Sequence, residues 1–170
     1  TSVNNDNVMI GVSAGYAGDN NWPQATDNVY IGSSAGRYLD DGYANVILGK
    51  EAGKSYSGGG NATSHNVYIG MEAGFNTTDT YRSIVIGYRA GYTMTTAPES
   101  VIIGDQAGYT LTTTTQTVLI GKDAGYNINA TGADGTVAIG YQAANALTSA
   151  AGLTAVGYQA GKSIVDGHSN

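Results

Sequence analysis

A short apolar triplet followed by glycine recurs nine times along the chain. The first copy reads NVMIGVSAG from Asn7, and the second reads NVYIGSSAG from Asn28. The first glycine of each copy lies at Gly11, Gly32, Gly49, Gly70, Gly87, Gly104, Gly121, Gly140 and Gly157. The intervals are 21, 17, 21, 17, 17, 17, 19 and 17 residues, a period of about seventeen with short insertions. Such a period is typical of a solenoid, in which each repeat stacks on its neighbours.

The triplet has the composition of a short strand because its residues are mostly β-branched and aliphatic. Side chains alternate along a strand, so the first and third residues, such as Val101 and Ile103, share a face. We expect that face to point into the core and the following glycine to turn the chain. An alanine three residues after that glycine occurs in every copy and predicts a tight interior position.

A second apolar position follows the second glycine by three residues in most copies. Its members are Leu39, Tyr56, Met94, Leu111, Ile128, Leu147 and Ile164. We expect a second short strand to begin there. The sequence therefore predicts an all-β fold, a parallel β-solenoid (β-roll) of nine coils of about 17 residues with two short strands per coil. Residues 1–170 would form a single repeat domain with loop insertions at 16–27, 54–65 and 126–135.

With this facing, the middle residue of each triplet would point to solvent. The row that results is mostly apolar and includes Tyr30, Ile47, Tyr68, Val85, Ile102 and Leu119. A continuous apolar row would be a larger exposed patch than soluble monomers usually carry. We interpret it as a lateral interface with another chain; the alternative is that strand propensity alone selects these residues.

Composition limits the classes of function. The chain of 170 residues has 26 Gly, 2 Pro, no Cys and a net charge of −6. Seven Lys and Arg cannot form the dense basic surface that nucleic acid requires, so we expect no nucleic-acid partner. No apolar run approaches the ~20 residues of a membrane span, so we expect no membrane insertion. The chain begins at Thr1 rather than Met, which favours a processed product or an excised segment.

The segments YIGMEAG from Tyr68, AIGYQA from Ala138 and AVGYQAG from Ala155 resemble known head repeats. They are similar to the head repeats of YadA-like trimeric autotransporter adhesins, and to the NTAVGYQAG-type repeats of phage tail-fibre and large secreted bacterial proteins. The resemblance extends from about Asn7 to Gly161. It implies a left-handed parallel β-roll that trimerises laterally, and an extracellular place at a cell surface or in a virion fibre. The adhesin repeats are near fourteen residues long, shorter than those of this chain. The shared motif carries no catalytic residue.

No arrangement for catalysis or metal binding stands out, and we expect no enzyme activity and no cofactor. His65 and His168 are more than a hundred residues apart. The pair Asp40-Asp41 has the hard oxygen ligands that Ca²⁺ prefers, but the calcium-binding nonapeptide of solenoids is absent. Acidic and basic residues after the turn alternate, as on an ordinary charged surface.

Two surface rows have functional interpretations. Tyr92, Tyr109 and Tyr126 follow the second glycine in consecutive copies and should stack. Such a strip could bind a glycan or a receptor; the alternative is stacking that only protects a corner of the solenoid. Short threonine rows at 93 and 110 and at 95 and 112 would suit an ice-binding face, a remote alternative because they span only two coils.

The ends of the predicted solenoid carry no evident cap. If the last coil of one molecule met the first coil of the next, the interval between glycines would be 13 + 11 = 24 residues, close to the longer coils. Head-to-tail contacts of that kind grow into filaments. The expected function is therefore that of a structural or adhesive extracellular fibre, with self-association as a homotrimer, a head-to-tail filament or both. The alternative is a receptor- or glycan-binding adhesin head.

Overall fold

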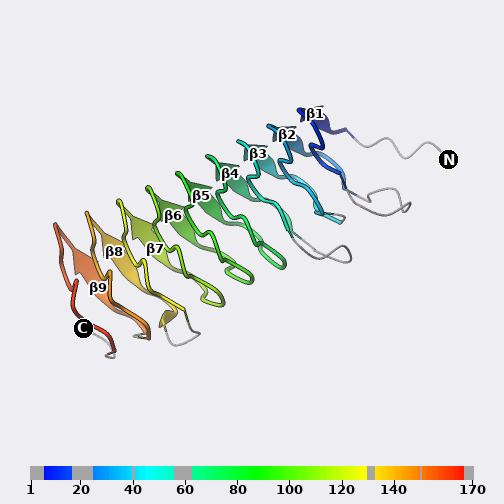
Figure 1. Ribbon diagram of the computed structural model, residues 1–170. Helices are drawn as coiled ribbons and strands as arrows, with labels where there is room; N and C mark the ends of the chain where they lie inside the picture. The colour runs from blue at the N-terminus through cyan, green and yellow to red at the C-terminus, as the bar shows by residue number, and fades with distance from the viewer. Residues whose placement is uncertain are drawn as a thin grey trace.

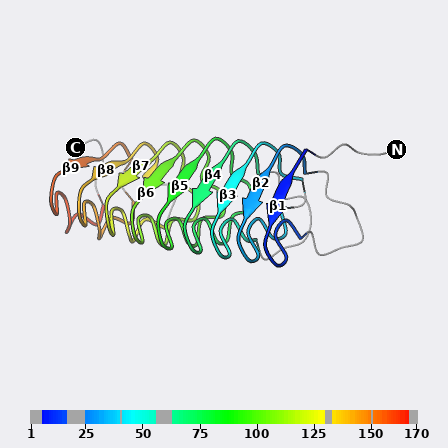
Figure 2. The ribbon, with the colours of Figure 1, turned by 90° about the horizontal axis from the view of Figure 1, so that it is seen from above.

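Nine parallel strands form a single sheet in which the strands follow one another in sequence order. The computed structural model describes residues 6–16, 25–39, 41–55, 63–129, 133–149 and 151–166. The strands are β1 (Val8–Ile10), β2 (Val29–Ile31), β3 (Val46–Leu48), β4 (Val67–Ile69), β5 (Ile84–Ile86), β6 (Val101–Ile103), β7 (Val118–Ile120), β8 (Val137–Ile139) and β9 (Thr154–Val156). Coils stack in one row (Figure 1), and the strands lie side by side along its length (Figure 2). The predicted parallel β-solenoid is confirmed.

The facing of the strands is opposite to the prediction. In β2 to β9 the middle residue is buried, whereas the first and third residues are partly or fully exposed. Ile102, for example, is 0% exposed, and its neighbours Val101 and Ile103 lie on the outside. The physical reason is the glycine directly after each strand, which turns the chain. The core therefore accepts only the middle side chain of each strand, together with the alanine that follows the turn. The prediction for the alanines is correct for Ala35, Ala52, Ala73, Ala90, Ala107, Ala124 and Ala143, all 0% exposed.

Each coil contains one strand in the described part of the chain, not the two that we predicted. Leu39, Met94, Leu111, Ile128 and Leu147 are nevertheless buried, and Ile164 packs partly against the core; Tyr56 lies outside the described residues. Their segments approach neighbouring coils through single backbone bonds, such as Thr93 N to Tyr109 O and Thr95 N to Thr112 O. One apolar side chain per coil fills the core without a strand around it.

The turn after each strand requires glycine for a steric reason. A Cβ on Gly104 would lie 2.4 Å from the carbonyl oxygen of Gly121 in the next coil, and the φ of Gly104 is +138°. The same contact, at 2.3 to 2.6 Å, recurs at the first glycine of the first eight coils. Two residues later the chain adopts φ near +55° with an ordinary side chain, as in Gln106 and Asp123. The backbone bond from Gln106 N to Tyr88 O, 2.9 Å long, helps to hold that conformation.

A ladder of polar side chains runs inside the solenoid immediately before the strands. Asn28, Asn45 and Asn66 are almost fully buried, and each Oδ1 accepts the backbone N–H of the equivalent residue in the next coil at 2.9 to 3.0 Å. Their Nδ2 groups donate both to the preceding side chain and to a backbone carbonyl, so their donors are satisfied. Ser83, Ser100 and Thr117 continue the row with hydroxyl groups. This ladder fixes the register of one coil on the next.

Of the predicted loop insertions, 16–27 and 54–65 fall largely outside the described residues, whereas 126–135 is described except for 130–132. Their described ends join the coils through single backbone bridges, as between Thr26 and Tyr43 and between Tyr43 and Ser64. Insertions of this kind leave the register of the sheet unchanged, because strands on both sides of each insertion pair in the common register.

Replacement of the first glycine should destabilise the fold far more than replacement of the second. Gly87→Ala places a Cβ 2.4 Å from Gly104 O at φ +135°, and we expect a loss of about 3 kcal/mol or more in the free energy of unfolding. Gly91→Ala has no contact closer than 3.4 Å, and Ala144 adopts the same conformation in coil 8 with φ 49°. Its expected cost is about 1 kcal/mol. Urea unfolding of both variants measures the difference; equal losses would contradict this explanation of the turn.

Candidate functional site

The residues predicted to form a lateral interface belong to the core. Tyr30, Ile47, Tyr68, Val85, Ile102 and Leu119 are all 0% exposed. A second chain cannot reach them while the solenoid is folded. The prediction of a lateral interface at these residues is therefore wrong, and the surface available for lateral contact is the opposite face of the same strands.

Two of these core residues are tyrosines with buried hydroxyl groups. Tyr68 Oη lies 2.5 Å from Thr80 Oγ1, and burial raises the pKa of Tyr68 to about 12. Burial raises the pKa of Tyr30 further, and the neighbouring Asn45 side chain offsets only part of this effect. Tyr30 Oη has no hydrogen bond of normal geometry within the described residues. Both hydroxyl groups are therefore neutral and buried in the core.

The outer sheet face, defined as the first and third residues of all nine strands, is a continuous apolar feature of the described surface. Its first row consists of Val8, Val29, Val46, Val67, Ile84, Val101, Val118, Val137 and Thr154. Its second row consists of Ile10, Ile31, Leu48, Ile69, Ile86, Ile103, Ile120, Ile139 and Val156. In the middle of the sheet Ile84 is still 39% exposed although ladder neighbours flank it on both sides.

The predicted tyrosine ladder exists and is one residue longer. Phe75, Tyr92, Tyr109 and Tyr126 form a tyrosine stack with centroid distances of 4.9, 5.1 and 5.1 Å and interplanar angles of 5° or less. Lys54 lies over Phe75 at one end, with its ammonium 5.0 Å from the ring centroid. In coil 8 the equivalent position is Asn145, so the stack of rings ends at Tyr126.

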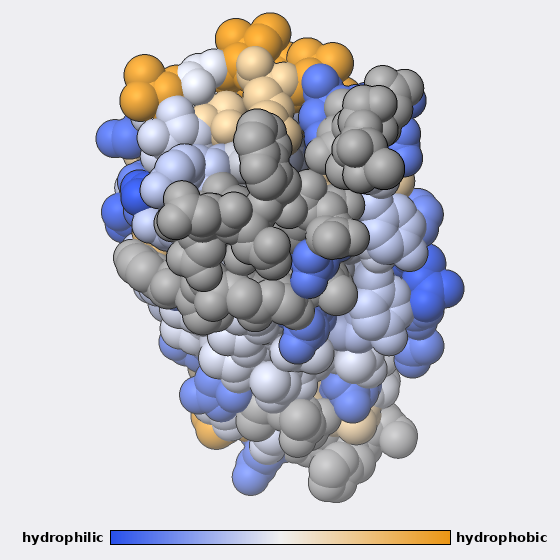
Figure 3. All heavy atoms as spheres, turned by 90° about the vertical axis from the view of Figure 1, so that its right-hand side faces the viewer, coloured by the Kyte–Doolittle hydropathy of each residue, from blue (hydrophilic) through white to orange (hydrophobic). Residues whose placement is uncertain are grey.

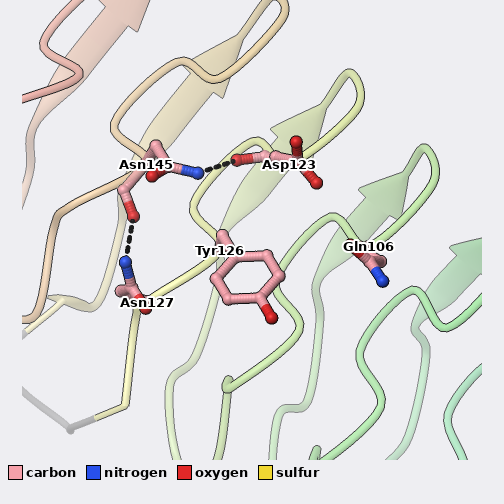
Figure 4. A pocket seen from close by; sticks show the side chains of 5 residues that line it. All are labelled: Gln106, Asp123, Tyr126, Asn127 and Asn145. Atoms are coloured by element: carbon pink, nitrogen blue, oxygen red, sulfur yellow. Dashed lines mark hydrogen bonds between the residues drawn. The ribbon is translucent and has the colours of Figure 1, made fainter.

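A shallow hollow of about 300 Å³ lies where the tyrosine stack ends. Gln106, Asp123, Tyr126, Asn127 and Asn145 line it, and the ring of Tyr126 lies between the two asparagines and Gln106 (Figure 4). Asn145 Nδ2 donates to the backbone oxygen of Asp123 at 3.1 Å, and Asn127 Nδ2 donates to that of Asn145 at 3.0 Å. These bonds orient both amides and leave their Oδ1 atoms as acceptors. The hollow thus combines one aromatic ring, three amides and one carboxylate.

The threonine rows have a structural explanation. The hydroxyl of Thr93 donates to Tyr109 O at 3.0 Å, and that of Thr110 donates to Tyr126 O at 2.8 Å. Thr95 and Thr112 bond to the next coil in the same way. Because backbone carbonyls of the next coil accept these hydrogen bonds, the threonine rows contribute to the stacking of coils.

The charged and histidine side chains form surface contacts. Arg89 Nε lies 2.6 Å from Glu72 Oε2, and Lys122 Nζ lies 3.3 Å from Asp105 Oδ2. His65 packs edge-on against Tyr43, with 5.0 Å between ring centroids, and His168 lies outside the described residues, as does Asp40. Among the described residues no three His, Asp or Glu side chains gather in a manner that could hold a metal ion. The described part of the chain also contains no helix that is long and apolar enough to cross a membrane.

Both ends of the sheet are open in the described part of the chain. β1 pairs only with β2, and β9 pairs only with β8. Side chains that are buried elsewhere become accessible at these ends: Met9 is 39% exposed, whereas Ile102 in the same row is 0% exposed. Figure 3 shows hydrophobic side chains gathered at one edge of the β1 end. At the other end Val156 and Tyr158 are 62% and 75% exposed.

Comparison of the chain with protein-family models, with curated proteins and with solved structures gives no match. The resemblance to adhesin head repeats therefore stays a prediction, and function has to be argued from the surface itself.

Two features of the site were missed in the sequence, although both leave a signal in the repeat. The buried ladder is a polar residue directly before the triplet in eight of nine copies, with Leu153 as the exception. The hollow arises where Asn145 replaces the aromatic residue of the four preceding copies. Alignment of the copies would have shown both.

The buried tyrosines predict a loss of stability in alkaline solution. In the unfolded chain tyrosine ionises near pH 10, and the folded values are higher, so this stabilisation is complete below pH 10 and is lost as pH rises toward 12. At pH 11 the loss should be about 1 kcal/mol for each tyrosine. Between pH 9.5 and 11.5 we expect the melting temperature of the double variant Tyr30→Phe, Tyr68→Phe to fall less than that of the wild type. Tyr158→Phe is the exposed control; an identical alkaline slope in the double variant would contradict the assignment.

Proposed function

We propose that this protein is a building block of an extracellular structural fibre in which β9 of one copy pairs with β1 of the next. The observation that carries the proposal is the complementarity of the two open ends. Residues in register would be Thr154 beside Val8, Ala155 beside Met9 and Val156 beside Ile10. The sheet would then continue from copy to copy at the same strand spacing.

Backbone donors at the β9 end match acceptors at the β1 end. The amide of the first strand residue donates forward in each coil, as from Val137 N to Leu153 O at 2.8 Å. Thr154 holds the same position in β9, and no coil follows it among the described residues. At the β1 end the equivalent acceptor is the carbonyl of Asn7, and no coil precedes it among the described residues. Junction pairing would satisfy both groups.

Donors at the β1 end match acceptors at the β9 end in the reverse direction. The amide of the first glycine donates backward, as from Gly157 N to Ile139 O at 2.8 Å. Gly11 has the same position in coil 1, and the matching acceptor is the carbonyl of Val156. Each end therefore offers both donors and acceptors, which favours head-to-tail growth over pairing of two like ends.

Side chains at the two ends also fit one another. The long side chain of Met9, 39% exposed, would cover the small Ala155 in the core row. Lys162 occupies the position of Arg37, whose guanidinium lies 5.4 Å from the Tyr16 centroid, and would face Tyr16 across the junction. The buried polar ladder ends at Leu153, so the junction would depend on backbone bonds and apolar contact.

The extracellular location, at a cell surface or in a virion fibre, is part of the same proposal. Its support is the resemblance of the repeats to those of adhesins and tail fibres, together with a chain whose length is devoted to one repeated structural unit. Nothing in this arrangement calls for a cofactor or a reaction.

Loss of the forward donor should stop growth at one end only. We expect Thr154→Pro to fold, because proline suits an edge strand whose N–H points outward. On electron micrographs the wild type should form fibres with an axial repeat near ~43 Å by strand spacing. Thr154→Pro alone should give no long fibres, and a tenth of it added to wild type should shorten fibres several-fold by capping their β9 ends.

The matched control is Thr154→Val, which retains the N–H and the β-branched shape and should form fibres like the wild type. Discrete rods of the wild type at every concentration would contradict the proposal. So would fibres of Thr154→Pro as long as those of the control.

A second candidate function, binding of a glycan as an adhesin does, is favoured by the hollow beside Tyr126. A sugar ring has an apolar face that suits an exposed aromatic ring, and its hydroxyl groups suit amide and carboxylate partners. The hollow offers no cationic group among its lining residues, so a neutral sugar fits better than an acidic one.

Glycan-array binding tests this second candidate. If the hollow binds sugars, Tyr126→Ala and Asn127→Ala should each reduce the signal at least tenfold. Tyr81→Ala, which removes an exposed ring outside the hollow and away from both ends, is the control and should bind like the wild type. Absence of any array signal for the wild type would exclude this function for neutral glycans on the array.

A further inference from the structure

The outer sheet face is apolar along the entire length of the solenoid. Of its eighteen positions, seventeen are Val, Ile or Leu and only Thr154 is polar. None of them carries a charge. Charged side chains such as Arg82 and Glu99 lie two residues before the strands, and these two approach to 3.0 Å. The face is therefore an apolar strip with several charged residues along the side that precedes the strands.

We infer that fibres of this protein pair laterally, with the outer sheet face of one fibre against the outer sheet face of another. The inference depends on the proposed function, since it takes the fibre as the unit that pairs. It replaces the lateral contact that the sequence placed at the middle strand residues.

The repeat of the face determines which partner fits. Its rows advance by one β-strand spacing, ~4.8 Å per coil. A partner that contacts every row without gaps needs side chains at the same spacing over the same length. Another copy of this chain has that spacing, and two apolar sheet faces pack well at about 10 Å. An unrelated globular partner would match only a few rows.

The size of the face explains why we expect pairing between fibres and not between single molecules. Nine strands at ~4.8 Å and a width near 10 Å give a face on the order of 500 Å². Two copies would then bury roughly 1,000 Å², at the lower limit for a specific interface. Two fibres repeat the contact at every subunit, so their association strengthens steeply with length.

The chemistry of the face also favours a rigid apolar contact. β-branched side chains have few χ1 rotamers, so Val and Ile lose little side-chain freedom when they are covered. In the interior of the sheet Val46 is 36% exposed and Ile84 39% exposed, so both present area that a partner can remove from water. A patch of this size lies toward the upper end of the range for the largest apolar patch of a soluble monomer, and such patches are often functional.

The test compares two triple variants at Ile86, Ile103 and Ile120. In one, all three become Thr; in the other, all three become Val. Val and Thr have nearly the same shape, so the variants differ by the polarity of three groups on each face. Cryo-electron microscopy counts single and paired fibres, and circular dichroism with thermal melting checks that both variants fold alike.

Wild type and the Val variant should form paired fibres, and in the Thr variant the paired fraction should fall at least tenfold while single fibres of normal length remain. Single fibres in the wild type would overturn the inference and leave the proposed function intact. Equal pairing in the Thr variant, or bundles built from three fibres, would overturn it as well. If the wild type instead floats with phosphatidylcholine vesicles and the Thr variant does not, lipid covers the face and the inference fails. Absence of any fibre would refute the proposed function itself.

Discussion

The close contact between the turn of one coil and the turn of the next determines most of this structure. A Cβ at Gly104 would lie 2.4 Å from the carbonyl oxygen of Gly121 in the next coil. The same close contact recurs at the corresponding glycine of each of the first eight coils. Identical turns must therefore stack in register. The left-handed conformation of residues such as Gln106, unfavourable for a side chain by itself, persists because the stacked backbone satisfies its hydrogen bonds.

Stacking in register converts each position of the repeat into a row of like side chains. Inside, the rows are the apolar core and the polar ladder that begins at Asn7; outside, they are the tyrosine stack and the outer sheet face. The same regularity leaves the two ends of the sheet with matching donors and acceptors. The surface features that could bind a partner are thus the two sheet edges, the continuous outer sheet face, and the hollow where Asn145 follows Tyr126 in the row of the tyrosine stack.

The period of the repeat and the parallel, in-order stacking of its coils could be predicted from sequence because they depend only on the positions of the glycines. The facing of the strands could not, because triplets such as Val101-Ile102-Ile103 are apolar at all three positions and contain no alternation. Because the first and third residues were expected inside, middle residues such as Tyr30 and Tyr68 were predicted to form a surface row, although both are buried. The second strand was inferred from single apolar residues such as Leu111, which one buried side chain per coil explains as well. The prediction that Tyr92, Tyr109 and Tyr126 stack was correct, and their role in binding stays a prediction.

The central claim is that the backbone ladder continues from one molecule into the next, and amide hydrogen exchange at the junction tests it most directly. In dilute, unassembled protein the amides of Gly11 and Thr154 should exchange rapidly, whereas that of Gly87, bonded to Ile69 O at 2.8 Å inside the sheet, should exchange slowly. In assembled protein all three should be protected. Fast exchange at Gly11 and Thr154 in assemblies would contradict the account, and so would full protection of both in the isolated molecule.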